Sequence, residues 1–385
     1  MELQQALANL HHAQIKKKKK QKRTNLIALP IGFALGILIS MSENLFFKEL
    51  EGATLLLMLA LLCTLPLQLI LHELGHLVFG LASNYRFVSF RVFSSAFYKK
   101  DGKLRFGRYR VPGTMGQCLM CPVQEDDTTP YRALFLGGVL VNAVTGLLSV
   151  IPLIFCYHIL FVRFLFIGMI FWGITLALIN GIPYKNGAVA NDGYHAKILK
   201  NSDARRVLFN QLRISAAMTE GICLCDMPKE WFIPPQNDSN DPLCVSLRMM
   251  EAEQEMECSR FDAAETILLD LAVHGENLTE FQLSAILADL LYLEMLKGHR
   301  HDVIELLHRE LNRYFMLTRN AFATLRIDIT YHYLFTGNLD KVKRLEKKFE
   351  KLTKRFPFTG EVARERSLIA HPKALYEGWR DSSHS

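Results

Sequence analysis

The stretch ATLLLMLALLCTLPLQLILHELGH, residues 53–76, passes from an uncharged apolar run directly into two histidines and a glutamate. A helix needs about 20 apolar residues to cross the hydrocarbon core of a bilayer, and residues 53–71 come close to that length. His72 and His76 are four residues apart, so on a helix their imidazoles project from one face. Ionisable side chains are costly in an apolar span and usually have a partner or a function there. The stretch therefore predicts a metal site inside or at the edge of a membrane helix.

The pattern His72-Glu73-Leu74-Gly75-His76 has the spacing of a hydrolytic metal site. Two imidazoles on one helix face can share a divalent ion, and Glu73 then lies beside an open coordination position. Such an ion lowers the pKa of a bound water, and the carboxylate can take the proton as the water attacks. The pattern therefore indicates metal-assisted hydrolysis.

The 385-residue chain has an apolar first half and a charged second half. Half of all residues are hydrophobic, yet the long apolar runs stop near Ile182. Beyond Ile182, charged and apolar residues alternate at helical spacing, which is typical of soluble helices. The net charge of +7 owes much to one run near the N-terminus, so it does not indicate a nucleic-acid partner. We expect a mostly α-helical, polytopic membrane half followed by a soluble helical half.

Four apolar runs and the placement of Lys and Arg predict the membrane topology. The runs cover residues 26–41, residues 53–82 and the two halves of residues 133–182. The run KKKKKQKR, residues 16–23, precedes the first span and is typical of a cytoplasmic anchor that contacts membrane lipid. Residues 84–131 are also rich in Lys and Arg, which places them in the cytoplasm. We therefore expect both termini in the cytoplasm and the histidine pair toward the cytosolic face.

The basic segment between the second and third spans contains a predicted β-hairpin. RFVSFRVF (residues 86–93) and KLRFGRYR (residues 103–110) flank a Lys-Asp-Gly turn. Its Phe and Arg content predicts a strand pair on the membrane surface. Strand addition to an extended substrate segment is a second use for such a pair.

A third ligand is needed, because a catalytic metal usually has three protein ligands and a water. Asp192, within an Asn-Asp-Gly triplet, follows the fourth span and lies by topology on the same side as the histidines. His195 is an alternative ligand, and the triplet could also form a plain turn. Asn142, inside the third span, needs a hydrogen-bond partner from another helix or from the site itself.

The soluble half contains three similar segments, about 40 residues apart, which begin at Cys258, Gly298 and Gly337. Each lies between amphipathic runs, a pattern similar to degenerate tetratricopeptide repeats, whose concave surface usually binds a protein partner. A plain helical bundle is the alternative. The eight cysteines match no secreted disulfide scaffold, and six of them lie in segments expected in the cytosol, where thiols stay reduced. For Cys118, Cys121, Cys223 and Cys225 we expect reduced thiols rather than ligands of a second zinc.

The membrane half resembles the site-2 protease family of intramembrane zinc metalloproteases over about residues 53–200. The matching motifs occur in the family's order: HELGH in one span, GGVLVN at 137–142 in the next, and NGIP at 180–183 followed by NDG at 191–193. The interval between Pro183 and Asp192 is longer than in the family's compact form, so both Asp192 and His195 remain candidates for the third ligand.

The resemblance implies an activity and a set of site residues. It implies Zn²⁺ bound by His72, His76 and Asp192, Glu73 as general base, and Asn142 and Asn180 as contacts of the unwound substrate. The implied function is hydrolysis of peptide bonds in or near transmembrane segments of membrane-protein or signal-peptide substrates, in a cell membrane of bacterial type.

Three domains are expected. These are a basic cytosolic tail (1–24), an intramembrane metalloprotease domain (25–200) and a cytosolic tetratricopeptide-like helical domain (201–385) that selects substrates or binds a protein partner. The alternative function is a membrane-anchored scaffold that binds partners through its helical repeats and holds a non-catalytic metal. A metal transporter fits less well, because such a protein needs ionisable residues distributed over several spans.

Overall fold

The structure, a computed structural model, describes residues 2–19, 53–110, 114–124, 129–186, 189–235, 242–275, 278–298, 300–354 and 356–382. Most of these residues are helical, and the remaining regular structure is a four-stranded sheet and a two-stranded ribbon. The mostly α-helical fold is thus confirmed. The chain divides into two compact units. One, here called the apolar unit, comprises Ile15–Phe93 and Val111–Asn201; the other, the helical unit, comprises Met1–Gln14, Ser94–Arg110 and Ser202–Ser385.

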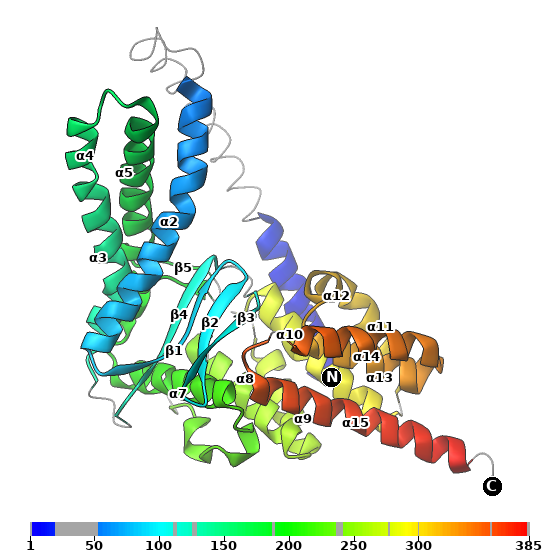
Figure 1. The fold of residues 1–385 in the computed structure, drawn as a ribbon. Helices are drawn as coiled ribbons and strands as arrows, with labels where there is room; N and C mark the ends of the chain where they lie inside the picture. The colour runs from blue at the N-terminus through cyan, green and yellow to red at the C-terminus, as the bar shows by residue number, and fades with distance from the viewer. Residues whose placement is uncertain are drawn as a thin grey trace. The chain divides into compact units, whose positions relative to one another are not determined.

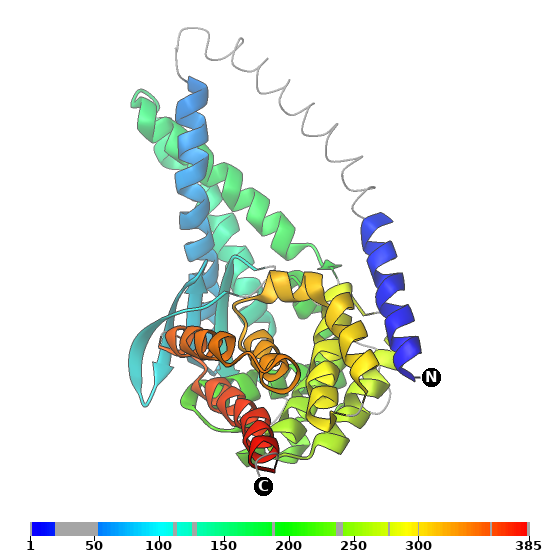
Figure 2. The same ribbon diagram turned by 90° about the vertical axis from the view of Figure 1, so that its right-hand side faces the viewer.

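The apolar unit contains helices that are long and apolar enough to cross a membrane. Three such stretches occur in the described chain: α2 (Ala53–Ala82), α3 (Arg132–Leu148) continued by α4 (Val150–Phe155), and α5 (Leu160–Gly181). Helices α2, α3 and α5 lie side by side (Figures 1 and 2). Large apolar side chains such as Leu62 and Leu178 are exposed on them, as a lipid environment favours. The expected first span, residues 26–41, lies outside the described residues.

Glycines bring α2 and α3 into backbone contact beside the histidines. A Cβ atom on Gly75 would lie 2.5 Å from the carbonyl oxygen of Gly137, which no real side chain tolerates. Small residues permit such close approach between helices that lack a hydrophobic driving force in lipid. The two glycines therefore place the α3 backbone against the turn of α2 that carries His72 and His76.

Four strands follow α2 in the sequence and form a sheet of order β3-β2-β1-β4. In the apolar unit, β1 (Tyr85–Val92) pairs antiparallel with β4 (Gly116–Pro122), with a register shift between Phe87 and Ser89. In the helical unit, β2 (Ser95–Lys100) pairs antiparallel with β3 (Lys103–Arg108). A short ribbon of β5 (Lys185–Asn186) and β6 (Val189–Ala190) precedes α6 (Asp192–Ile198).

The single hairpin predicted for this segment is wrong in its pairing. Asp101 and Gly102 do form the expected turn, with φ angles of 50° and 73°, but the turn joins β2 to β3. Residues 86–93 pair with β4 instead. The prediction missed a second turn after β1, where Phe93 has a φ of 54°. A bulky residue rarely adopts a positive φ, so this turn has no composition signal.

The helical unit is built from helices joined by short turns. They are α7 (Ser202–Glu220), the 3₁₀ helices η1 (Leu224–Asp226) and η2 (Lys229–Trp231), α8 (Pro242–Glu257), α9 (Phe261–Val273), α10 (Glu280–Lys297), α11 (His301–Glu310), α12 (Asn312–Thr318), α13 (Phe322–Tyr331), the π-helix η3 (His332–Thr336), α14 (Leu339–Thr353) and α15 (Thr359–Ser382). The three similar sequence segments each form a turn between two helices. Ser259, Gly298 and Gly337 adopt left-handed conformations there, with φ of 60°, 70° and 60°, as is usual after a helix C-terminus.

The N-terminal segment differs from the separate tail expected for residues 1–24. Residues 2–19 form a helix, and Ala6, Leu10 and Ala13 on it are buried in the core of the helical unit with residues of α9 and α10. The side-chain amide of Asn9 donates hydrogen bonds of 2.9 Å to the carbonyl oxygens of Ala272 and Val273. These carbonyls end α9 and have no partner within that helix, so Asn9 caps it.

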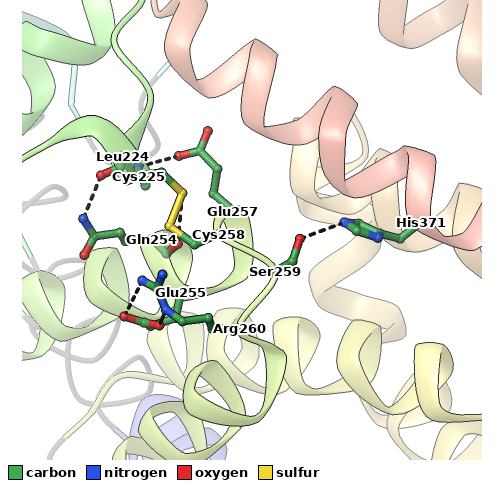
Figure 3. Close-up of a disulfide and its surroundings, with 9 residues drawn as sticks. All are labelled: Leu224, Cys225, Gln254, Glu255, Glu257, Cys258, Ser259, Arg260 and His371. Atoms are coloured by element: carbon green, nitrogen blue, oxygen red, sulfur yellow. Dashed lines mark hydrogen bonds and ion pairs between the residues drawn. A yellow bond between two sulfur atoms is a disulfide. The ribbon is translucent and has the colours of Figure 1, made fainter.

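Cys225 and Cys258 form a disulfide in the helical unit (Figure 3). It connects η1 to the turn that follows α8, and neighbouring hydrogen bonds make the same connection: Gln254 Nε2 donates to the carbonyl oxygen of Leu224 at 2.7 Å, and the Cys225 N–H donates to Glu257 at 3.2 Å. The prediction that the six cysteines expected in the cytosol are reduced is wrong for this pair. The two positions are 33 residues apart and meet only through the tertiary fold, which their spacing does not show.

Removing this disulfide should destabilise the helical unit. Closing a loop of 33 residues restricts the unfolded chain, and this restriction is worth roughly 3–4 kcal/mol. We expect Cys258→Ser, or a thiol reductant, to lower the Tm of the full chain in detergent, followed by circular dichroism. Cys223→Ser is the control, because Cys223 lies two residues from Cys225 and forms no disulfide. An equal Tm for wild type and Cys258→Ser would contradict the prediction.

Candidate metal centre

Three possible metal ligands from two helices converge in the apolar unit. His72 and His76 come from α2, and Asp192 is the first residue of α6. Asp192 Oδ2 lies 3.1 Å from His72 Nε2 and 3.5 Å from His76 Nε2, and the two Nε2 atoms are 3.2 Å apart. A tetrahedral ion with bonds of about 2.0–2.1 Å separates its ligand atoms by about 3.3 Å. The three atoms therefore have the spacing of one face of a tetrahedral coordination shell.

The hydrogen bonds on the far side of each imidazole leave Nε2 for a cation. His72 Nδ1 lies 2.5 Å from Asn142 Oδ1, and His76 Nδ1 lies 2.7 Å from the carbonyl oxygen of Leu134. These oxygens only accept, so each Nδ1 carries the proton and each Nε2 keeps a lone pair. Within the described residues, Asp192 Oδ2 has no hydrogen-bond donor. Two lone pairs and a carboxylate oxygen thus face one another, an arrangement that a divalent cation stabilises.

Asn191 determines where Asp192 lies. Its Oδ1 accepts hydrogen bonds of 2.9 Å from the backbone N–H groups of Tyr184 and Tyr194, and the second of these bonds caps α6. Its Nδ2 donates to the carbonyl oxygens of Ile179 and Ile182 at 2.6 Å. The Asn-Asp-Gly triplet is therefore a helix N-terminus tied to the end of α5, not a plain turn. This attachment holds Asp192 beside the histidines of α2.

His195, the alternative third ligand, lies on the same short helix but outside the converging group. Its ring packs on Phe135, with ring centroids 5.1 Å apart. Burial lowers the pKa of His195 and outweighs the opposing effect of Asp192, so its imidazole is held in the neutral form. The structure thus brings Asp192, rather than His195, to the histidine pair.

Glu73 is 6% exposed and lies between α2 and the start of β4. A Cβ atom on Gly116, the first residue of β4, would overlap Glu73 Oε1. The fully buried Arg91 holds this strand end, because its guanidinium donates to the carbonyl oxygens of Phe93 at 2.7 Å and Gly116 at 3.2 Å. Neither Arg91 nor Gly116 was predicted from the sequence as part of the site. The only signal for Arg91 is a cation at a strand position between two Phe residues.

Gly138 gives the imidazoles their space. A Cβ atom at this position of α3 would lie 2.7 Å from His76 Nε2 and 2.8 Å from His72 Nδ1. The rings therefore lie directly on the α3 backbone, with only a hydrogen atom of Gly138 between them. The adjacent glycines of α3 thus have two roles: Gly137 permits helix packing, and Gly138 makes room for the imidazoles.

The two asparagines expected to contact substrate have different surroundings. Asn142 is fully buried, and its side chain bonds to His72 and Gln68. Asn180 lies at the end of α5, and its Nδ2 donates to the Leu176 carbonyl oxygen at 3.0 Å within that helix. Substrate contact by either residue stays a prediction, and the described partners of Asn142 make it a support of His72.

Comparisons of the chain with models of protein families, with curated proteins and with solved structures found no match. A functional assignment therefore depends on the motifs and on the geometry of the centre.

Gly138→Ala should remove most of the metal from the purified protein, because the added methyl group occupies the space of both imidazoles. We expect this loss in the metal content per chain after dialysis against a weak chelator, measured by mass spectrometry of the metal. Gly378→Ala is the matched control, since a Cβ atom there meets no other atom within 4 Å. Full metal content in Gly138→Ala would contradict the close contact.

Proposed function

We propose that this protein is an intramembrane zinc metalloprotease. It would hydrolyse peptide bonds in or near transmembrane segments of membrane-protein or signal-peptide substrates. The observation that carries the proposal is the triangle of His72 Nε2, His76 Nε2 and Asp192 Oδ2, with sides of 3.1–3.5 Å, beside Glu73 and among apolar helices.

The donor set favours zinc over other divalent ions. Two imidazole nitrogens and one carboxylate oxygen are typical zinc ligands, whereas Mg²⁺ and Ca²⁺ prefer six or more oxygen atoms. His72, His76 and Asp192 would hold the ion and leave a fourth position, which is usual in catalytic rather than structural zinc sites. Bound there, zinc would lower the pKa of a water molecule and polarise a peptide carbonyl.

Glu73 supplies the proton transfer. It directly follows the first histidine of α2 and is absent from the converging ligand atoms, so its carboxylate stays available as a base. The carboxylate would accept a proton during attack and deliver it to the leaving amide nitrogen. The same helix turn thus provides both the ligands and the base.

The surroundings indicate a substrate that lies in the membrane. Both histidines lie on α2, and α2 and the neighbouring α3 are each part of a stretch long and apolar enough to span a bilayer. A helical peptide bond is hydrogen-bonded and shielded, so a substrate helix must unwind before hydrolysis. Because β4 is an edge strand and begins over Glu73, an extended segment that pairs along β4 would come close to the carboxylate.

The location proposed for the chain is the cell membrane, with both termini in the cytoplasm. Its support is the excess of Lys and Arg in residues 16–23 and 84–131. In a reducing cytosol the Cys225–Cys258 bond would form only when the thiol poise becomes oxidising. In this location the helical unit would select substrates or bind a protein partner, as stacked helix pairs of similar spacing often do.

Glu73→Gln should abolish proteolysis while the protein keeps its metal. Loss of a general base lowers a rate by about 100-fold or more, and the amide cannot take up the proton. We expect membrane peptides to accumulate in cells with the variant relative to wild type, measured by mass spectrometry of the membrane fraction. His72→Ala serves as the comparison that loses metal and activity together. Wild-type levels of membrane peptides in cells with the metal-loaded Glu73→Gln variant would exclude this mechanism, and the same levels with metal-free His72→Ala would favour a scaffold with a non-catalytic metal.

Asp192 and His195 can be separated directly. Asp192→Ala should lose the metal, because it removes one corner of the ligand triangle. His195→Ala should retain it, because His195 lies outside the converging group. Metal content per chain and the visible spectrum of the Co²⁺-loaded proteins measure both outcomes. The reverse pattern would assign the third ligand to His195.

A further inference from the structure

A buried polar chain connects the metal centre to α5, and it begins at Gln68. Gln68 lies one helical turn before His72 on α2 and is the only amide side chain in the apolar run of residues 53–71. Gln68 and Asn142 are both 0% exposed. A buried amide without partners is costly, so each of its hydrogen bonds is expected to be used.

The hydrogen bonds of this chain cross three helices. Gln68 Nε2 donates to the carbonyl oxygen of Met169 on α5 at 3.1 Å. Gln68 Oε1 accepts from Asn142 Nδ2 on α3 at 2.7 Å and from Thr145 Oγ1 at 3.3 Å. Asn142 Nδ2 also donates to the Gln68 carbonyl oxygen at 3.0 Å, and Asn142 Oδ1 lies 2.5 Å from His72 Nδ1.

The carbonyl acceptors at the two ends of the network set the direction of its hydrogen bonds. The Met169 carbonyl can only accept, so the Gln68 amide must present Nε2 to α5 and Oε1 to α3. Gln68 Oε1 and the Gln68 backbone carbonyl both accept from the NH₂ group of Asn142, which turns the Asn142 oxygen toward His72. His72 Nδ1 must then donate, and this tautomer leaves Nε2 unprotonated for the metal.

We propose that Gln68 is a positioning residue of the metal centre. It fixes the amide orientation of Asn142 and thereby the tautomer and ring orientation of His72. The inference deepens the proposed function, since it rests on the proposed metal site. Partners behind a ligand histidine commonly change metal affinity by about 10–100-fold when removed.

A purely structural role for Gln68 is the competing explanation, because its bond to Met169 also joins α2 to α5. The structure offers a matched control for that role. Trp172 Nε1 on α5 donates to the carbonyl oxygen of Leu61 on α2 at 2.9 Å, and this bond does not contact the chain to His72. Trp172→Phe therefore removes an α2–α5 hydrogen bond and leaves the hydrogen bonds from Gln68 to His72 intact.

The test measures the zinc affinity of the full chain in detergent by competition with a chromophoric chelator. We expect Gln68→Leu to weaken zinc binding by roughly 10–100-fold and to change the visible spectrum of the Co²⁺-loaded protein. Trp172→Phe should leave both unchanged. Gln68→Met, which has a flexible apolar side chain of similar length, is the second variant if Gln68→Leu does not fold.

A double-mutant cycle tests whether Gln68 acts through Asn142. In an Asn142→Ala background the hydrogen bonds between Gln68 and His72 are already lost, so Gln68→Leu should cause no further loss of zinc affinity. Independent effects that multiply, or wild-type affinity in Gln68→Leu, would overturn the proposal. So would an equal loss of affinity in Trp172→Phe, because it would show that any loosening of α2 against α5 suffices.

These outcomes are separate from those of the proposed function, because zinc affinity is measured without substrate. Wild-type levels of membrane peptides in cells with either Glu73→Gln or His72→Ala would refute the protease and leave the role of Gln68 standing. Unchanged affinity in Gln68→Leu, with zinc bound tightly by the wild type, would refute only the role of Gln68. A wild-type chain that binds no divalent metal would overturn both.

Discussion

Two imidazole nitrogens and a carboxylate oxygen face one another at 3.1–3.5 Å among apolar helices, and the rest of the apolar unit depends on this arrangement. Lone pairs so close together repel, and a low-dielectric environment strengthens the repulsion. A divalent cation converts it into attraction. The helix contacts, the cap of α6 and the buried amides all serve to keep the three atoms in place, which is the expected design of a preformed metal site.

Close packing and hydrogen bonding divide this task between them. Gly75 and Gly138 let the α3 backbone approach the histidine turn, and no larger residue fits at either position. Asn191 caps α6 through the Tyr194 N–H, and it ties this helix to the end of α5 through Ile179 and Ile182 and to Tyr184 just beyond. Because Asn142 is fully buried among apolar helices, its hydrogen bonds must be made within the protein. The groups that hold the site therefore have few other hydrogen-bond partners or packing positions available to them.

The sequence was sufficient to predict the parts of the site that lie on one regular helix. The spacing of His72 and His76 identified the pair, and counting spans placed Asp192 on the same side. The contacts of Arg91 and Gly116 could not be predicted, because they depend on the β1–β4 register and its irregularity after Phe87. The predicted strand pairing was wrong because the turn at Phe93 was not foreseen. The disulfide and the packing of residues 2–14 depend on contacts between segments far apart in the chain.

The position of Glu73 favours the proposed catalytic centre over a structural one. A metal that only stabilises a fold is best held by four protein ligands. A further carboxylate buried beside such a site would cost desolvation energy and have no function there. In this chain three ligand atoms converge, and the nearest further carboxylate in the sequence, Glu73, is kept 6% exposed under the glycine that begins β4. Burying that side chain is unfavourable for folding alone. The proposed proton transfer during peptide hydrolysis would give it a use, whereas a scaffold would not.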